Sequence, residues 1–416
     1  MKVCIHRGTQ EVGGTCIEIE SQGKRIALDV GLPLEGADSI ENLPQVNGFR
    51  ERHESLLAVA ISHPHLDHYG LAHYLPPDTQ MIMGGATERI LKTAALFTPT
   101  GVKFENVIHL EPDKPLSIEP FTITPYLNDH SAYDAYSFLI SAEGQTLFYS
   151  GDFRGHGRKK ALFERLLKRP PSDVDVLLME GTTIGRLGSE AELKTEEDLE
   201  SCFEEHINNT KGMVLVWTSG QNVDRLVTVF KACKKLGRQL ILDLYTAEIL
   251  RATENPNLPQ ADWSGVKVFL PDSQRRQILK TQQFELSERY KPHRIYPERL
   301  AGDAPRSVML FRPSMSRDLD KAGCLKDARL VYSLWPGYLK RKELRSFQEW
   351  LKKHGIPLAH CHTSGHGSPQ DLQRFAKAIA PKMLVPIHSF ATHRFKDFFE
   401  NVQMKEDGQW WEVPHA

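Results

Sequence analysis

Cysteine is scarce in this sequence. Its 416 residues include only six cysteines, and no two of them form a Cys-x-x-Cys pair. Such few and irregular cysteines are not typical of a disulfide framework, and they favour a reducing compartment, which we take to be the cytoplasm. Long apolar runs are also absent. The longest, such as 56–61 and 213–217, have the length of strands and are too short to cross a bilayer.

An excess of charge of one sign is lacking too. The formal net charge is −1, so the whole molecule exerts no general attraction on nucleic acid, and any site for a polyanion must be local. The first residues lead directly into a strand pattern without the apolar stretch of a signal peptide. We therefore expect no membrane contact.

The length and the residue pattern predict two α/β domains. A chain of 416 residues exceeds what one hydrophobic core usually organises. Up to about residue 180 the pattern predicts mainly short strands, at 15–20, 25–29, 57–62, 121–126, 136–141, 146–150 and 175–179, with helices at 86–97 and 159–167.

After about residue 190, strands and helices alternate, which is typical of a parallel sheet. The pattern predicts helices at 195–208, 223–236, 247–253 and 343–354, and strands at 213–217, 239–242, 307–311 and 329–333. A last block follows, with strands at 357–361 and 383–386 and helices at 369–379 and 392–401.

Histidine is the most informative residue type, because several of the 18 histidines are clustered. The run His63-Pro64-His65-Leu66-Asp67-His68 directly follows the apolar strand expected at 57–62. Zinc binds neutral imidazole nitrogen and carboxylate oxygen, and a loop after a strand can direct four such ligands to one place. The motif therefore predicts a metal site.

More candidate ligands follow other expected strands. His130 follows the strand at 121–126, Asp152 follows Gly151 after the strand at 146–150, and His388 follows the strand at 383–386. Each alone is more often a capping residue or a buried, hydrogen-bonded histidine. Together with the six-residue motif they complete two adjacent metal sites.

The order of these motifs resembles the metallo-β-lactamase superfamily. Three further stretches, 179–183, 362–368 and 384–388, resemble the additional motifs of its β-CASP branch of nucleases. Within that branch the sequence is most similar to the ribonuclease J family, through residues 11–14, 27–32 and 130–136. The resemblance implies an α/β fold, namely an αββα sandwich of residues 1–185 and 356–416 with an inserted β-CASP domain at 186–355.

The resemblance also implies an activity and its residues. It implies a ribonuclease with two zinc ions that hydrolyses RNA phosphodiester bonds, by internal cleavage, from the 5′ end or both, leaving 5′-phosphate and 3′-hydroxyl. The implied ligands are His63, His65 and His130 for one ion, Asp67, His68 and His388 for the other, and Asp152 as the bridge, with Asp29 orienting a ligand histidine. For Asp29, capping of a turn is an equal alternative.

Two zinc ions about 3.5–4 Å apart can hold a hydroxide and clamp the oxygens of a phosphodiester. Asp67 would also position this hydroxide. In the resembling family, a histidine matching His366 protonates the leaving oxygen and a carboxylate matching Glu180 orients it. A strand-end salt bridge and an ordinary loop histidine are the alternatives for this pair. Ser364, Gly365 and Ser368 are candidate donors to a phosphate.

Local charge favours a polyanion as the substrate, and single-stranded RNA fits best. Residues 154–169 carry seven Lys or Arg and one Glu, and 340–353 is basic as well. A solvated helix face is the alternative for both runs. Trp217, Trp335 and Tyr338 could stack on bases, although packing in a core or an interface explains each of them better.

The sequence departs from the family at two places. Ser389-Phe390 follows the late histidine, where ribonuclease J usually has Gly-Glu, and the C-terminal domain of ribonuclease J is lacking. A homodimer and processive cleavage therefore stay open. The rival functions are a DNA nuclease of the same branch, whose members tend to have valine in place of His388, an ester or thioester hydrolase, and a non-catalytic RNA-binding subunit.

Overall fold

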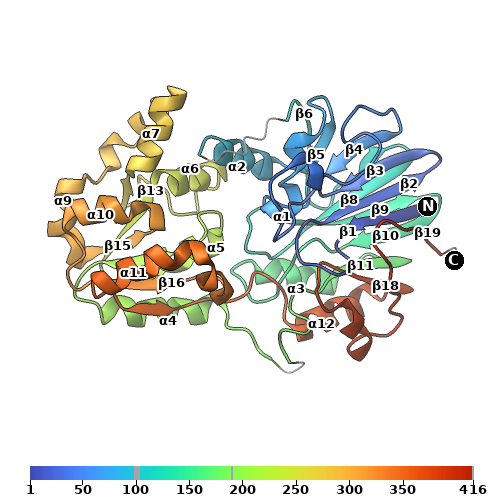
Figure 1. Cartoon of the computed structure of the whole chain (residues 1–416). Coiled ribbons are helices and arrows are strands. Elements are labelled where there is room, and N and C mark those ends of the chain that lie inside the picture. Colours follow the sequence, from blue (N-terminus) through green and yellow to red (C-terminus); the bar gives the residue numbers. More distant parts are fainter. Residues whose placement is uncertain (98–103, 189–190, 415–416) are drawn as a thin grey trace. The chain divides into compact units, whose positions relative to one another are not determined.

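The computed structural model describes residues 1–97, 104–188 and 191–414. It divides into two compact units (Figure 1). Unit 1 comprises Met1–Leu193 and Gly365–Ala416, and unit 2 comprises Lys194–Ser364. These divisions lie eight and nine residues after the boundaries expected at 185/186 and 355/356.

Unit 1 contains two sheets in its described residues. The seven-stranded sheet has the order β19-β1-β2-β3-β4-β5-β6, and the six-stranded sheet has the order β18-β11-β10-β9-β8-β7. The strands of the first are β1 (Lys2–Arg7), β2 (Cys16–Ser21), β3 (Lys24–Leu28), β4 (Leu56–Ala60), β5 (Gln80–Gly84), β6 (Asn106–Leu110) and β19 (Trp410–Glu412). Those of the second are β7 (Leu116–Ile118), β8 (Phe121–Leu127), β9 (Tyr136–Ala142), β10 (Gln145–Tyr149), β11 (Val176–Glu180) and β18 (Met383–Ile387).

The two sheets share one apolar core. Alternate residues of each strand point to the same side, so Ile17 and Ile19 of β2 join Phe138 and Ile140 of β9 in that core. Burial of each such side chain contributes about 1.5–3 kcal/mol. Helices α2 (Gly85–Ala95) on one outer face, and α3 (Lys160–Lys168) and α12 (Pro369–Ile379) on the other, complete four layers. The expected αββα sandwich is confirmed.

Unit 2 contains a parallel sheet with the order β14-β13-β15-β12-β16-β17. Its strands are β12 (Val214–Trp217), β13 (Gln239–Asp243), β14 (Val266–Phe269), β15 (Ser307–Leu310), β16 (Arg329–Tyr332) and β17 (Leu358–His360). The main helices are α4 (Glu196–Asn208), α5 (Val223–Lys235), α6 (Leu244–Ala252), α7 (Asp272–Thr281), α9 (Pro297–Asp303), α10 (Ser316–Ala322) and α11 (Arg345–Lys353), with a single turn at α8 (Glu285–Glu288). The parallel sheet expected from the alternation is present.

Three local predictions need correction. The strand expected in the last block at 357–361 is β17, which pairs with β16 and belongs to the sheet of unit 2. A 3-10 helix, Thr392–Asp397, replaces the helix expected at 392–401, because the chain beyond it returns to β18, where Leu384 bonds with Asn401 and Gln403. Finally, Cys202 and Cys361 form a disulfide in unit 2, although the cysteine pattern predicted none.

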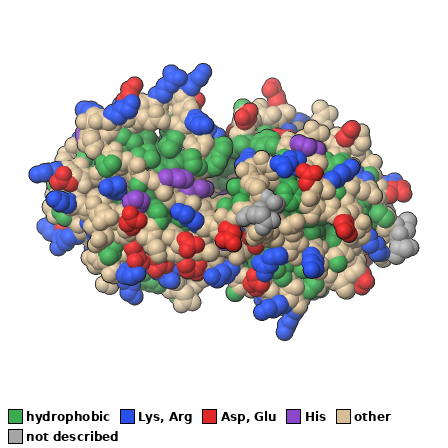
Figure 2. All heavy atoms as spheres, turned by 90° about the horizontal axis from the view of Figure 1, so that it is seen from below, with side chains coloured by type: hydrophobic (Ala, Val, Ile, Leu, Met, Phe, Trp, Pro, Cys, Tyr) green, Lys and Arg blue, Asp and Glu red, His purple; other side chains and the backbone are tan. Residues whose placement is uncertain are grey.

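The outer surface bears charges of both signs. Figure 2 shows Lys and Arg side chains interspersed with Asp and Glu over the visible face, in keeping with a net charge of −1. Within the described residues, none of the helices is both long enough and apolar enough to pass through a bilayer.

Candidate metal centre and acid pair

The candidate residues of unit 1 follow the carboxyl ends of strands. In one sheet, β3 and β4 are parallel and lead to Asp29 and to the loop with His63. In the other, β10, β11 and β18 are parallel and lead to Asp152, Glu180 and His388. Parallel neighbours end at the same edge of a sheet, so residues far apart in the sequence meet there.

The loop after β4 is shaped by close backbone contacts. Pro64 follows the strand, and His65 precedes the short helix α1 (Leu66–Tyr69). This turn lies against Gly31, where an added Cβ would come within 1.8 Å of the Asp67 carbonyl oxygen. Only glycine permits that approach, so the glycine after β3 holds the ligand loop in place.

Three histidines form the first group. The ligand nitrogens of His63, His65 and His130 all lie within 4.8 Å of one another. His130 Nε2 is 3.1 Å from His65 Nδ1. The rings of His63 and His130 meet edge to face, with centroids 4.7 Å apart. Such a set of convergent imidazoles is a typical zinc-binding arrangement.

Two carboxylates and two histidines form the second group: Asp67, His68, Asp152 and His388. His68 Nε2 lies 3.2 Å from Asp152 Oδ2, and His388 Nε2 lies 3.6 Å from Asp67 Oδ2. Asp152 Oδ2 is also 3.8 Å from His63 Nε2, so its carboxylate adjoins both groups. The backbone of His388 has a φ of 50°, which costs a non-glycine residue about 1–3 kcal/mol and is often seen at functional sites.

A network behind these groups orients the rings. The Asp29 carboxylate lies 2.7 Å from His68 Nδ1 and accepts hydrogen bonds from the Ser62 amide at 2.7 Å and the Tyr149 hydroxyl at 2.6 Å. Thr182 Oγ1 lies 3.0 Å from His388 Nδ1. With Nδ1 donating in both cases, the Nε2 lone pair of each ring points into the centre.

The residues present fit two metal ions. Four buried ligand atoms have no hydrogen-bond partner among the described residues, namely His63 Nε2, His130 Nδ1, Asp152 Oδ1 and His388 Nε2. A buried polar atom without a partner costs about 1–3 kcal/mol, which a bound ion would remove. Ligands about 2.1 Å from a tetrahedral zinc are roughly 3.3 Å apart, close to the 3.2 Å between His68 Nε2 and Asp152 Oδ2.

The electrostatics of His63, His65 and Asp152 agree with the ligand chemistry, whereas at His68 burial is outweighed by the charges of Asp152 and Asp29, which raise the pKa. Burial lowers the pKa of His65 to about 4 and, together with adjacent histidines, lowers the pKa of His63 well below its usual range. Burial opposes ionisation of Asp152, but the nearby His388 and His68 outweigh it, so the pKa of this carboxyl group is lowered. Neutral imidazole and ionised carboxylate are the forms that bind zinc.

His366 and Glu180 form a pair beside the metal groups. His366 Nδ1 is 3.1 Å from both carboxylate oxygens of Glu180 and 3.6 Å from Asp152 Oδ2. Glu180 also accepts hydrogen bonds from the amides of Phe153 and Thr182. Burial lowers the pKa of His366, but the charges of Glu180 and Asp152 outweigh it and raise the pKa to about 9. His366 therefore carries a proton at neutral pH.

The three candidate phosphate contacts differ in their surroundings. Gly365 lies so close to Ser131 that an added Cβ would be 2.7 Å from its hydroxyl. Ser368 is the N-cap of α12, and its hydroxyl accepts a hydrogen bond from the Asp371 amide. Capping alone accounts for a serine there. Ser364 is the last residue of unit 2.

Several supporting residues were not predicted. The Tyr149 hydroxyl donates to Asp29, and Thr182 Oγ1 lies beside the His388 ring. Asp129 accepts a bond from the Gly157 amide at 2.8 Å and pairs with the buried Arg154. Tyr149 directly precedes the Ser-Gly-Asp turn, and Thr182 directly follows Glu180-Gly181. Position beside a motif is the one signal that could have found them.

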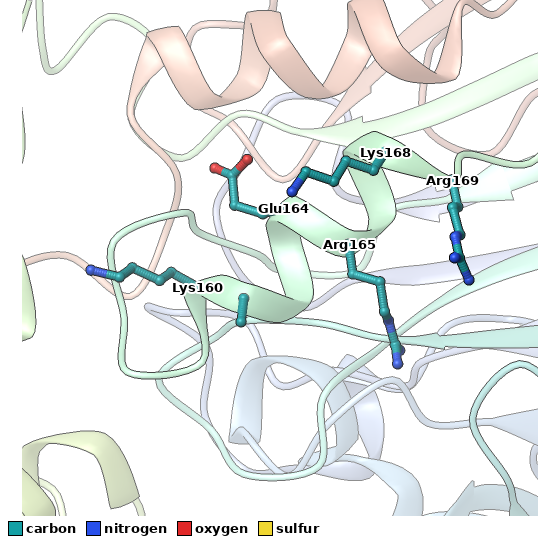
Figure 3. A pocket seen from close by; sticks show the side chains of 6 residues that line it. Lys160, Glu164, Arg165, Lys168 and Arg169 are labelled. Carbon is teal, nitrogen blue, oxygen red and sulfur yellow. The ribbon is translucent and has the colours of Figure 1, made fainter.

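A basic hollow lies along α3. It measures about 740 Å³ and is lined by Lys160, Ala161, Glu164, Arg165, Lys168 and Arg169. Figure 3 shows that Arg165 on α3 and Arg169 just after α3 extend in the same direction. At the start of α3, Lys159 donates a hydrogen bond of 2.8 Å to the His130 carbonyl. Through Lys159, the N-terminal end of α3 therefore contacts His130 of the candidate metal centre.

Comparison with known proteins agrees with this geometry. A family profile described as beta-lactamase superfamily domain matches residues 34–201. Residues 34–201 therefore resemble a beta-lactamase superfamily domain. The match includes the loop with residues 63–68, His130, Asp152 and Glu180, whereas His366 and His388 lie beyond it.

Relatives extend the likeness beyond the beta-lactamase superfamily domain. Ribonuclease J of Helicobacter pylori is 23% identical to this chain, in an alignment that covers 100% of this chain and 61% of the relative. Ribonuclease J of Sinorhizobium meliloti is also 23% identical and covers 87% of this chain and 62% of its own length. The chain resembles ribonuclease J but spans only about three fifths of these relatives.

Two further matches support less, because one covers only part of the chain and the other has low sequence identity. The cleavage and polyadenylation specificity factor 73 of Drosophila melanogaster is 29% identical over 42% of this chain and 27% of its own length. A solved structure from Enterococcus faecalis, described as a protein of unknown function, superimposes with a TM-score of 0.79 at 20% identity, covering 99% of both chains. This last match establishes the fold alone.

Proposed function

We propose that the chain is a zinc-dependent ribonuclease that hydrolyses phosphodiester bonds of single-stranded RNA in the cytoplasm. The observation that carries the proposal is the set of buried His and Asp atoms without partners, which lies directly beside the Glu180–His366 pair. His63, His65 and His130 would hold one zinc ion, Asp67, His68 and His388 the other, with Asp152 between them. The names of the relatives support RNA as the substrate.

Two bound zinc ions would supply a water of lowered pKa and positive charge for the phosphodiester oxygens. Asp67, whose side chain is partly exposed, can accept a hydrogen bond from the attacking water. His366 would give its proton from Nε2 to the leaving 3′-oxygen, while Glu180 holds Nδ1–H. The products would be a 5′-phosphate and a 3′-hydroxyl.

The basic hollow supports a polyanionic substrate. Lys160, Arg165, Lys168 and Arg169 could contact successive phosphates that lead from the metal centre. Arg165 is only weakly engaged elsewhere, since it lies 3.4 Å from the exposed Asp113. Contacts of this kind position the strand without reading its sequence.

End-labelled RNA with a 5′-monophosphate or a 5′-triphosphate tests the function. We expect zinc-dependent cleavage that a chelator abolishes and added zinc restores. The product ladder would show whether cleavage is internal or begins at the 5′ end. A DNA oligonucleotide of the same sequence is the matched control. Equal or faster cleavage of DNA would favour a DNA nuclease, and no cleavage of either by the zinc-loaded protein would refute the proposal.

A further inference from the structure

A second group of metal-binding side chains lies in unit 2. Cys202 on α4 and Cys361, directly after β17, form the disulfide, with Cα atoms 6.2 Å apart. His206 lies one helical turn after Cys202. Its ring nitrogen and the two sulfurs all lie within 4.8 Å of one another. None of these residues belongs to the metal centre of unit 1.

The three donors are well placed by the fold. Residues four apart on a helix share one face, so Cys202 and His206 both point toward Cys361. Cys361 is fixed by its backbone, because its amide donates to the Tyr332 carbonyl at 3.1 Å and its carbonyl accepts from the Ser333 hydroxyl.

This donor set suits a particular class of ion. Two thiolates and one imidazole favour zinc over magnesium or calcium, and three protein ligands leave a fourth position for water. Cys361 is buried, whereas Cys202 and His206 are partly exposed, so an ion can enter from solvent. A tetrahedral ion would hold the sulfurs roughly 3.7 Å apart, within the range that a Cα separation of 6.2 Å permits.

We propose that Cys202, His206 and Cys361 bind one zinc ion when the chain is reduced. The disulfide is the oxidised, metal-free form of the same site. A hydroperoxide converts the zinc-bound form into the disulfide: the two thiolates lose two electrons and form the S–S bond, the hydroperoxide takes these electrons and two protons, and zinc, water and an alcohol are released. A dithiol reductant reverses the step and restores both thiols.

Cobalt(II) tests the site on the full chain. Cobalt bound to thiolate has an intense sulfur-to-metal charge-transfer band, which the nitrogen and oxygen ligands of unit 1 cannot produce. In the reduced protein we expect this band to saturate at the intensity of one thiolate-bound cobalt ion per chain, and to be lost after treatment with a hydroperoxide. Its absence from reduced protein, with both thiols shown by alkylation to be free, would overturn the proposal.

Variants separate the metal site from the disulfide alone. Cys202→Ser and Cys361→Ser should lose the band. His206→Ala retains both sulfurs and a good helix-forming residue, and should weaken cobalt binding about tenfold or more while the oxidised protein still forms the disulfide. Cys233→Ser, at a buried free cysteine of the same unit, is the control and should bind as the wild type does. Unchanged affinity in His206→Ala would contradict the assignment.

Discussion

Unit 1 and unit 2 both bury charged groups, but they treat them differently. In unit 2, the guanidinium of Arg225 lies 3.1 Å from both carboxylate oxygens of Glu196, and both side chains are fully buried. The Thr228 hydroxyl adds a third bond to this carboxylate, at 2.7 Å. Residues of unit 2 therefore satisfy both carboxylate oxygens of Glu196.

In unit 1, the buried groups at the strand ends are left incomplete. His63, His130, Asp152 and His388 each have a buried ligand atom with no partner among the described residues. A buried polar atom without a partner lowers the stability of the fold, whereas the buried ion pair of unit 2 leaves no such atom on its carboxylate. The charges of the paired group in unit 2 neutralise each other, whereas a cation would complete the group of unit 1. Four substitutions can break or sharpen this contrast.

The largest effect is expected from Asp67→Ala. This carboxylate lies next to His388 and would bind one ion and position water, so its loss should lower RNA cleavage by about 10³-fold or more and reduce the zinc content. Cleavage rates and metal analysis measure both effects. Asp78→Ala, at an exposed carboxylate paired with Arg52, is the control and should change neither. A fully metallated, active Asp67→Ala protein would refute its assignment.

His366→Gln should keep both zinc ions and lower turnover by roughly 10²–10⁴-fold. The wild-type rate should also depend on pH. The pKa of His366 is raised to about 9, so the acid is present at neutral pH and is lost as the pH rises through that value. Single-turnover rates should therefore fall about tenfold per pH unit above it, and the variant should lack this limb. An identical alkaline limb in both proteins would remove His366 from the acid role.

Arg225→Ala should destabilise the protein without affecting the metals. It leaves the Glu196 carboxylate buried and unpaired, which costs about 3–5 kcal/mol, and the transition of unit 2 in chemical denaturation should shift accordingly. Zinc content and cleavage by the folded fraction should stay as in the wild type. Arg225→Met with Glu196→Leu removes both charges and should recover most of the loss. Failure of this pair to recover would mean that packing, not charge, dominates there.

The smallest of the four effects is expected from Asp29→Asn. The amide retains the shape but can present its NH₂ group to His68 Nδ1, so the ring is no longer held in the required tautomer. Zinc affinity should fall about 10–100-fold, measured by competition with a chelating dye. Tyr149→Phe removes one hydrogen bond to the same carboxylate and should have a weaker effect in the same direction. Unchanged affinity in Asp29→Asn would favour the capping role.

Much of the fold could be predicted because its signals are local. Apolar strands followed by Gly, Asp or His mark the strand ends, and the alternation after residue 190 marks a parallel sheet. The helix expected at 369–379 has the bounds Pro369–Ile379, because Ser368 and Asp371 form a capping box that the sequence displays.

The rest depends on contacts between distant residues. Periodicity at 357–361 predicts a strand but not the sheet in which it pairs. Similarly, Cys202 and Cys361 are 159 residues apart, and no spacing rule connects them. For the candidate site, the motifs predicted which residue types assemble. The order of residues does not indicate that the Tyr149 hydroxyl bonds to Asp29 or that Thr182 lies beside the His388 ring.

The pairing of β1 with β19 and of β11 with β18 has a consequence for synthesis. Lys2 pairs with Glu412, and Glu180 pairs with Ile387. Each sheet of unit 1 is therefore completed only when its C-terminal strand, β19 or β18, has been synthesised. The N-terminal strands leave the ribosome long before β18 and β19, and unit 2 is synthesised between them. During that time β1 and β11 present unpaired edges, which are prone to aggregation. Nascent chains should therefore depend on chaperones until Glu412 has emerged.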